Sequence, residues 1–133
     1  MTVANMETTE SRLIAEAHAA VLEQSKKNAF KAAPYERAIE LLESLRTTGF
    51  VNERVQLALD ITVVTRNDYR PDLSRRALYA AFPSQGQIPD LRLRRKWFTF
   101  AAAIEGNLGN VEGAFRYKLA ALDLCEQLSL IHI

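Results

Sequence analysis

Few side chains in this sequence have the type and spacing that catalysis or metal binding requires. His18 and His132 are the only histidines, and neither has a cysteine or a second histidine at metal-ligand spacing. We expect His18 to be a partly buried packing residue and Cys125 a small core residue, since free cysteine is commonly buried. The sequence also lacks a glycine-rich phosphate loop and the G-x-S-x-G and H-E-x-x-H motifs. We therefore predict no catalytic residue, no metal and no cofactor.

The distribution of charge is more distinctive than the total. The net charge is +1, but residues 66–96 hold eight basic side chains against three acidic ones, and both flanking segments are net acidic. Such a cluster suits an acidic peptide, a phosphate-bearing ligand or a nucleic acid, and a solvated helix surface is the alternative. The eight basic residues are Arg66, Arg70, Arg75, Arg76, Arg92, Arg94, Arg95 and Lys96.

Aromatic residues follow this basic cluster directly. Trp97, Phe98 and Phe100 beside arginines could stack on nucleic-acid bases. Their spacing favours another interpretation, because Trp97, Phe100 and Ile104 recur at three- and four-residue intervals and share one helix face. We expect these three residues to be core and Phe98 to be exposed.

The composition predicts a single helical domain. Hydrophobic residues make up 48% of the 133 residues and charged residues 25%, which is close to average soluble usage and excludes disorder. Five glycines and four prolines are few, so the chain has few turns to make. One cysteine, no secretory pattern at the start and no run of ~20 apolar residues indicate a soluble cytoplasmic protein.

Apolar residues recur with helical periodicity in six segments, and all four prolines fall at the predicted helix ends. In the last segment Leu124 or Cys125 faces inward with Ala114, Tyr117 and Ala121. The predicted helices cover residues 9–28, 34–49, 52–64, 71–82, 89–108 and 111–130, with Asn52 and Asp90 near two of the starts and a flexible lead-in over 1–8.

The starts of these segments repeat at a nearly constant interval. The even-numbered helices begin near 34, 71 and 110, and the third and fifth helices begin about 38 residues apart. A fixed period with two helices per repeat is typical of stacked helical solenoids. We therefore predict one all-α domain over 9–133, made of three antiparallel hairpins at about 9–49, 50–83 and 88–130.

Residues 106–124, GNLGNVEGAFRYKLAALDL, resemble the second half of a tetratricopeptide repeat (TPR). Gly109 and Asn110 match the turn of that repeat, and Ala114 and Ala121 match its two small packing residues. Glu105 stands where the family usually has a tyrosine. The segment PYERAIELLESL resembles the second-helix pattern of the family more weakly. The resemblance implies a short, right-handed, TPR-like solenoid.

In TPR proteins the first helix of each hairpin lines a concave groove that receives a peptide or a neighbouring domain. The resemblance thus implies that Lys96, Thr99, Ala103 and Asn107 line such a groove here. Arg92 and Arg95 join them as candidates from the basic cluster. Arg54 and Thr62 are further candidates on the third predicted helix.

The last repeat is similar in style to repeats in the sensory part of bacterial signalling proteins, such as those that precede GGDEF-type diguanylate cyclase domains. This resemblance implies a non-catalytic protein-interaction module in the regulatory part of a larger signalling protein. A self-association domain and a nucleic-acid-binding domain remain alternatives. The apolar end of the sixth helix, with Leu128, Leu130, Ile131 and Ile133, predicts a homodimer through that helix.

Overall fold

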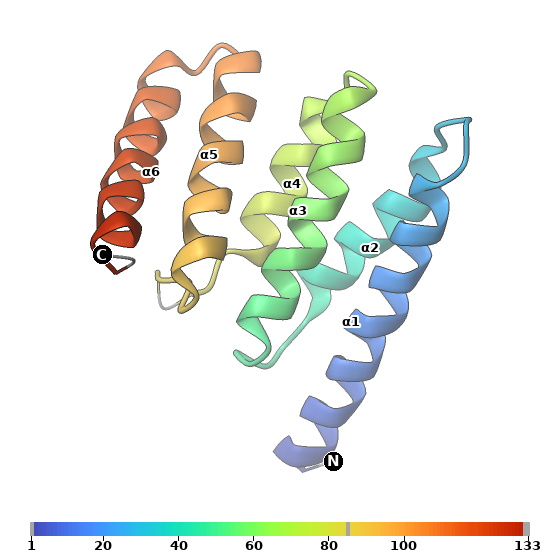
Figure 1. The fold of residues 1–133 in the computed structure, drawn as a ribbon. Coiled ribbons are helices and arrows are strands. Elements are labelled where there is room, and N and C mark those ends of the chain that lie inside the picture. The colour runs from blue at the N-terminus through green and yellow to red at the C-terminus, as the bar shows by residue number, and fades with distance from the viewer. Residues whose placement is uncertain (1, 85, 132–133) are drawn as a thin grey trace.

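The structure, a computed structural model, describes residues 2–84 and 86–131. These residues form six α-helices and no β-strand, which confirms the prediction of an all-α protein with six helices (Figure 1). No helix among them is long and apolar enough to cross a membrane. The helices are α1 (Val3–Ser25), α2 (Ala32–Ser44), α3 (Val51–Asn67), α4 (Pro71–Ala81), α5 (Leu91–Asn107) and α6 (Val111–Ile131).

Each odd-numbered helix packs against the even-numbered helix that follows it: α1 on α2, α3 on α4, and α5 on α6. Helix α3 also contacts α1 and α5, and α4 also contacts α2 and α5. In Figure 1 the helices follow one another in chain order from right to left, with α1 and α6 at opposite sides. Helix α3 therefore lies in the middle of the molecule.

This central helix is buried on more than one side. Four residues of the predicted apolar face are buried, whereas Val63 is 44% exposed. The buried four are Val55, Ala58, Leu59 and Thr62. Polar side chains inside the helix are satisfied locally: the hydroxyls of two buried threonines donate to backbone carbonyls one turn earlier, at 2.7 and 2.9 Å. The buried residues of α3 are Val55, Leu57, Ala58, Leu59, Ile61, Thr62 and Thr65.

Trp97 joins α4, α5 and α6 at the other end of the core. Its side chain is 1% exposed, and its indole N–H donates to the carbonyl oxygen of Leu78 at 2.8 Å. The rings of Tyr79 and Tyr117 meet the indole edge-to-face, at 5.7 and 5.5 Å between centroids. The predicted core position of Trp97 is confirmed.

Three other predictions for side chains differ from the structure. Phe98 was expected to be exposed, but it is half-buried between Trp97 and Tyr117 because α6 covers this side of α5. Phe100 is half-buried and faces α3. Cys125, expected in the core, is exposed, and Leu124 faces inward in its place.

Several helix ends were predicted correctly from capping residues. Pro71 occupies the first turn of α4, where a missing N–H costs nothing. Asp90 caps α5, since its carboxylate accepts from the N–H groups of Arg92 and Leu93 at 2.9 and 3.0 Å. Gly109 adopts a φ of +85° between α5 and α6, in the left-handed region that favours glycine.

The starts of α1 and α3 differ from the prediction. Helix α1 begins at Val3 instead of Thr9, because the Thr2 hydroxyl caps it by accepting from the Asn5 N–H at 3.2 Å. The lead-in expected over residues 1–8 is therefore helical from Val3. Helix α3 begins after Phe50 and not at Asn52. Phe50 has a φ of +57° and packs its side chain against the core, so tertiary packing sets this start.

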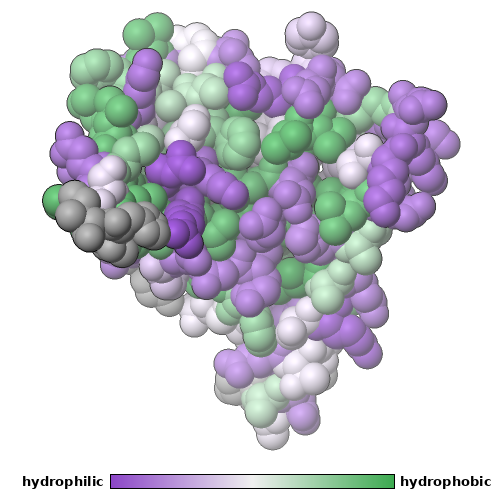
Figure 2. Space-filling model, viewed as in Figure 1, coloured by the Kyte–Doolittle hydropathy of each residue, from purple (hydrophilic) through white to green (hydrophobic). Residues whose placement is uncertain are grey.

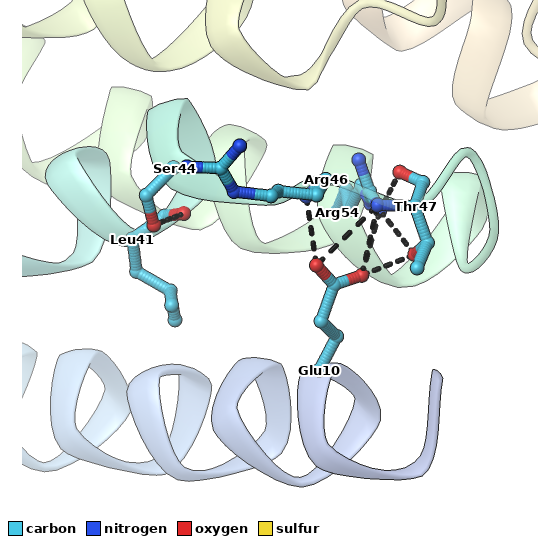
Figure 3. A network of polar contacts seen from close by, with 6 residues as sticks. All are labelled: Glu10, Leu41, Ser44, Arg46, Thr47 and Arg54. Atoms are coloured by element: carbon cyan, nitrogen blue, oxygen red, sulfur yellow. Dashed lines mark hydrogen bonds and ion pairs between the residues drawn. The ribbon is translucent and has the colours of Figure 1, made fainter. Parts of the chain in front are cut away.

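Glu10 explains why α2 ends at Ser44 and not at the predicted Gly49. Its carboxylate, on α1, accepts from the backbone N–H of Arg46 at 2.7 Å, and from the backbone N–H and hydroxyl of Thr47 (Figure 3). These two N–H groups are therefore not available to continue the helix. The Arg54 guanidinium lies 3.6 Å from the same carboxylate and donates to the Thr47 carbonyl.

The surroundings of Glu10 also favour its charged form. Burial raises the pKa of this carboxyl, but the hydrogen bonds from Thr47 and Arg46 and the charge of Arg54 outweigh burial, so its pKa lies below the ordinary value. A carboxyl with a lowered pKa stabilises the folded state above its unfolded-state pKa. That stabilisation is lost as the pH falls through the folded-state value.

Replacing Trp97 with alanine should lower the free energy of unfolding by about 3 to 5 kcal/mol, because a buried ring shared by three helices leaves a cavity. Chemical denaturation followed by circular dichroism measures this change. Tyr69→Ala is the control, since this ring is 90% exposed and its loss should change the stability little. Equal denaturation midpoints for the Trp97 variant and the parent would contradict the burial of the indole.

Glu10→Gln should lower the stability at pH 7, and the gap to the parent should narrow as the pH falls below about 4.5, the ordinary pKa of this carboxyl. Urea denaturation at a series of pH values measures the gap. Glu7→Gln changes an exposed carboxyl on the same helix and should leave the stability within about 0.5 kcal/mol of the parent. If the difference in stability between Glu10→Gln and the parent stays constant down to pH 3, the charge of Glu10 does not stabilise the folded state.

Candidate partner-binding groove

Two neighbouring hollows cross the odd-numbered helices. The first, of about 410 Å³, lies between α1 and α3 and is also lined by Leu93 of α5. The second, of about 320 Å³, lies between α3 and α5. Gln56 of α3 lines both hollows, so they adjoin each other, and we call the two together the groove across α1, α3 and α5. In Figures 1 and 2 this face is turned toward the viewer and carries a mosaic of hydrophilic and hydrophobic side chains.

A polar cluster lies at the centre of the groove. His18 Nε2 of α1 meets one carboxylate oxygen of Asp60, and Gln56 Nε2 donates to the other at 3.1 Å. The side chains of His18 and Asp60 are each 28% exposed. His18 is therefore partly buried as expected, but a specific polar contact between α1 and α3 holds it in place.

The two sides of the groove carry opposite charge. Glu53, in the first turn of α3, lines the hollow beside α1. Arg95 and Lys96 of α5 line the hollow between α3 and α5, together with Thr99. The Thr99 hydroxyl donates to the Arg95 carbonyl at 2.9 Å, which leaves its oxygen able to accept a hydrogen bond from a ligand.

Apolar side chains fill the spaces between these polar groups. Ile14 and Phe50 line the hollow between α1 and α3. Leu59, Val63 and Phe100 line the hollow between α3 and α5. A groove with a few placed polar groups between apolar side chains is the usual composition of a binding site.

The residues predicted for the groove fall in three places. Arg95, Lys96 and Thr99 share the hollow between α3 and α5. Ala103, again with Thr99, lies in a different hollow, between α5 and α6. Asn107 lies near the end of α3, beside Arg66.

Three further candidates lie outside these hollows. Arg92 is exposed in the first turn of α5. Thr62 is fully buried, and Arg54 points to Glu10 and Thr47, so neither residue lines the groove. Both lie on sides of α3 that face other parts of the chain, which the periodicity of a single helix does not reveal.

The basic cluster of residues 66–96 is divided among several helices and partly neutralised. Arg70 pairs with Asp72, and Arg76 on α4 pairs with Glu43 on α2 at 2.7 Å. Arg94 donates to the Ile88 carbonyl at 2.7 Å. Much of the excess positive charge in this segment is therefore engaged within the protein.

Glu105 is a buried carboxylate whose role the sequence did not reveal. It is 1% exposed, and it pairs with Arg75 of α4 at 2.8 Å. Asn110, in the turn before α6, donates to its second oxygen at 2.8 Å. Tyr79 also donates to Glu105, at 3.1 Å, and shares a hydrogen bond with Tyr117 of α6. The carboxylate thus joins α4, α5 and α6.

The donors around Glu105 all come from the chain itself, and this arrangement indicates a structural role. Burial, the hydrogen bond with Tyr117 and the charge of Glu105 raise the pKa of the Tyr79 hydroxyl above its ordinary value. A phenol with a raised pKa is a weaker acid, so Tyr79 acts here as a neutral hydrogen-bond donor. The sequence contained one sign of this role: Glu105 stands, before the Gly109-Asn110 turn, at a position where TPR repeats usually have a tyrosine.

Within residues 2–84 and 86–131, no group of three His, Cys, Asp or Glu side chains lies close enough together to hold a metal ion. Comparisons with protein-family models, with curated proteins and with solved structures each found no match to this chain. The geometry of the groove is therefore the main guide to function.

Glu105→Ala should lower the free energy of unfolding by about 1 to 3 kcal/mol, because it leaves the donors of Tyr79 and Asn110 without this acceptor, whereas Arg75 is 50% exposed and can bind water instead. Thermal and chemical denaturation measure the loss. Glu112→Ala is the matched control: its side chain is 78% exposed and pairs only with a neighbour on its own helix, so its loss should cost little. Similar losses for the two variants would contradict a structural role for Glu105.

Proposed function

We propose that this chain is a non-catalytic protein-interaction module of the TPR-like type. In this proposal three helical hairpins stack as a short right-handed solenoid, and the groove across α1, α3 and α5 receives an extended segment of a partner protein. The repeat interval of 37 to 39 residues and the TPR-like segment 106–124 support it. The contacts of α3 with both α1 and α5 also support it, since stacked repeats bring their first helices together.

The observation that carries the proposal is that two hollows, one between α1 and α3 and the other between α3 and α5, share Gln56 in their linings. An extended peptide needs apolar contacts for its side chains and hydrogen-bond partners for its backbone. Val63 and Phe100 offer the first, and Gln56 and Thr99 offer the second. The basic side of the groove, formed by Arg95 and Lys96, favours a partner segment with an acidic residue at that end.

We further propose that the module belongs to the regulatory part of a larger bacterial signal-transduction protein in the cytoplasm. The support is the similarity of the last helix pair to repeats in the sensory part of such proteins. The role proposed here is to bind a peptide or a neighbouring domain, with no reaction of its own. Determining which domain, if any, adjoins this segment in the native gene would test the wider assignment directly.

A nucleic-acid-binding role is the weaker alternative. A phosphate backbone requires a contiguous basic surface, whereas Arg70, Arg75 and Arg76 are paired with carboxylates. Binding through phosphate contacts weakens steeply as salt is raised, because counterions are released. Ligand binding that persists at high salt would favour the groove proposal over this alternative.

Peptides selected from a displayed random library against the chain should contain an acidic residue and should bind in the groove. Lys96→Glu should weaken their binding by about tenfold or more, since it replaces a charge-assisted hydrogen bond with repulsion. Val63→Asp should also weaken binding, because it places a charge on the apolar side of the groove. Fluorescence anisotropy of labelled peptides measures both effects.

Lys27→Glu is the matched control, since it makes the same charge change at an exposed residue beyond the end of α1. It should leave peptide affinity unchanged. Peptides that bind all three variants equally well would place the binding site elsewhere. Selected peptides without acidic residues would contradict the proposed role of Arg95 and Lys96.

A further inference from the structure

The hollow between α1 and α3 carries a negative charge that the described chain does not neutralise. The described residues that line it include no lysine and no arginine, and Glu53 is the one carboxylate among them. His18 also lines this hollow, but its imidazole is engaged with Asp60. Glu53 is exposed, and within residues 2–84 and 86–131 its carboxylate has no hydrogen-bond or ion-pair partner.

Other oxygen atoms join this carboxylate in the same hollow. Ser11 of α1 and Asn52 of α3 line it, and their hydroxyl and amide oxygens can accept hydrogen bonds. A cationic group with several N–H donors can use all three side chains at once. An anionic group would instead be repelled by Glu53. The polar part of the hollow thus matches an ammonium or a guanidinium group.

The rest of the hollow suits the methylene stem of a basic side chain. Ala15 of α1, Phe50 before α3 and Leu93 of α5 form an apolar part of its lining. Lysine and arginine side chains lay their stems along apolar surface and keep the charged end among polar groups. An aromatic ring such as that of Phe50 also attracts a cation over its face.

The neighbouring hollow, between α3 and α5, carries the opposite charge. Arg95 and Lys96 line it, and neither side chain has a hydrogen-bond or ion-pair partner in the described part of the chain. Asp60 lines it too, but His18 and Gln56 each engage one oxygen of its carboxylate. Two adjoining hollows therefore offer one negative and two positive side chains that the fold itself does not use.

The helix spacing sets the distance between the two charges that a ligand needs. Packed helices lie roughly 8–10 Å apart, and the two hollows are displaced by about one helix spacing because α3 separates them. An extended chain advances about 3.3 Å per residue. The two hollows thus suit opposite charges about two to four residues apart on an extended segment.

We propose that the hollow between α1 and α3 binds a lysine or arginine side chain of the partner segment, about two to four residues from the acidic residue that binds at Arg95 and Lys96. This inference rests on the proposed function and adds a second charge requirement to it. Glu53 is the residue that determines the requirement. It favours a segment with both charges and repels a segment that is acidic throughout.

Peptide affinity tests the role of Glu53. Peptides selected from a displayed library should carry a basic residue two to four positions from the acidic one. Glu53→Gln should weaken their binding by about tenfold, since it removes a charge-assisted hydrogen bond, and fluorescence anisotropy measures the change. Glu112→Gln is the matched control, because it removes an exposed carboxylate in the first turn of α6 and should leave affinity unchanged.

A double-mutant cycle tests direct pairing. The basic residue of a selected peptide is replaced with glutamine, and this peptide is measured against the parent chain and against Glu53→Gln. The two losses should not add, because either change removes the same interaction. Glu53→Lys should prefer a peptide with glutamate at that position. Losses that add fully, or no change of preference with Glu53→Lys, would overturn the proposal.

Carbodiimide crosslinking identifies the contact independently. This reagent joins a lysine amine to a carboxylate in direct contact, and mass spectrometry locates the amide bond. A lysine of the selected peptide should couple to Glu53, and the acidic residue of the peptide should couple to Lys96. Coupling of that lysine mainly to exposed carboxylates outside the groove, such as Glu23, would overturn the subsite.

The same peptides separate failure of the subsite from failure of the groove. Peptides that lose affinity for Lys96→Glu and Val63→Asp but bind Glu53→Lys as well as the parent would overturn the subsite and leave the groove in place. Selected peptides without a basic residue would do the same. Peptides indifferent to all three variants, or a library that yields no binding peptide, would contradict the proposed function itself.

Discussion

The burial of α3 on several sides is the constraint on which the rest of the structure depends. Its seven buried residues contact helices on either side of it, so α1, α2, α4 and α5 are all placed relative to this one helix. A helix in such a position can leave only a narrow stripe accessible. That stripe includes Gln56, Asp60 and Val63, and the flanking helices α1 and α5 turn it into the floor of a groove. The groove is thus a consequence of how the core is filled.

Two buried carboxylates complete the positions of the helices around α3. Glu10 holds the segment between α2 and α3 through backbone N–H groups, and Glu105 joins α4 and α5 to α6. A buried charge is costly unless donors surround it, so each carboxylate specifies the arrangement that supplies its donors. The hydrogen-bond donors to both carboxylates are groups of the chain itself. Neither Glu10 nor Glu105 lines the groove.

The groove and the outer face of α6 have different chemistry and suit different partners. The groove combines an acidic and a basic side with apolar side chains, as an extended peptide requires. The outer face of α6 exposes the apolar side chains of Val111, Phe115, Leu119, Leu122 and Leu130.

The sequence by itself determined the number of helices and several of their ends, because periodicity and capping are local properties. Pro71, Asp90 and the Gly109-Asn110 turn needed no tertiary information, and the burial of Trp97 followed from its spacing. Only the tertiary structure decided that Glu10 ends α2 early and that Cys125 faces outward. Periodicity shows which residues share a helix face, but the partner of each face depends on contacts between segments far apart in the chain. For the same reason, periodicity could not show that the residues predicted for one groove lie in different hollows.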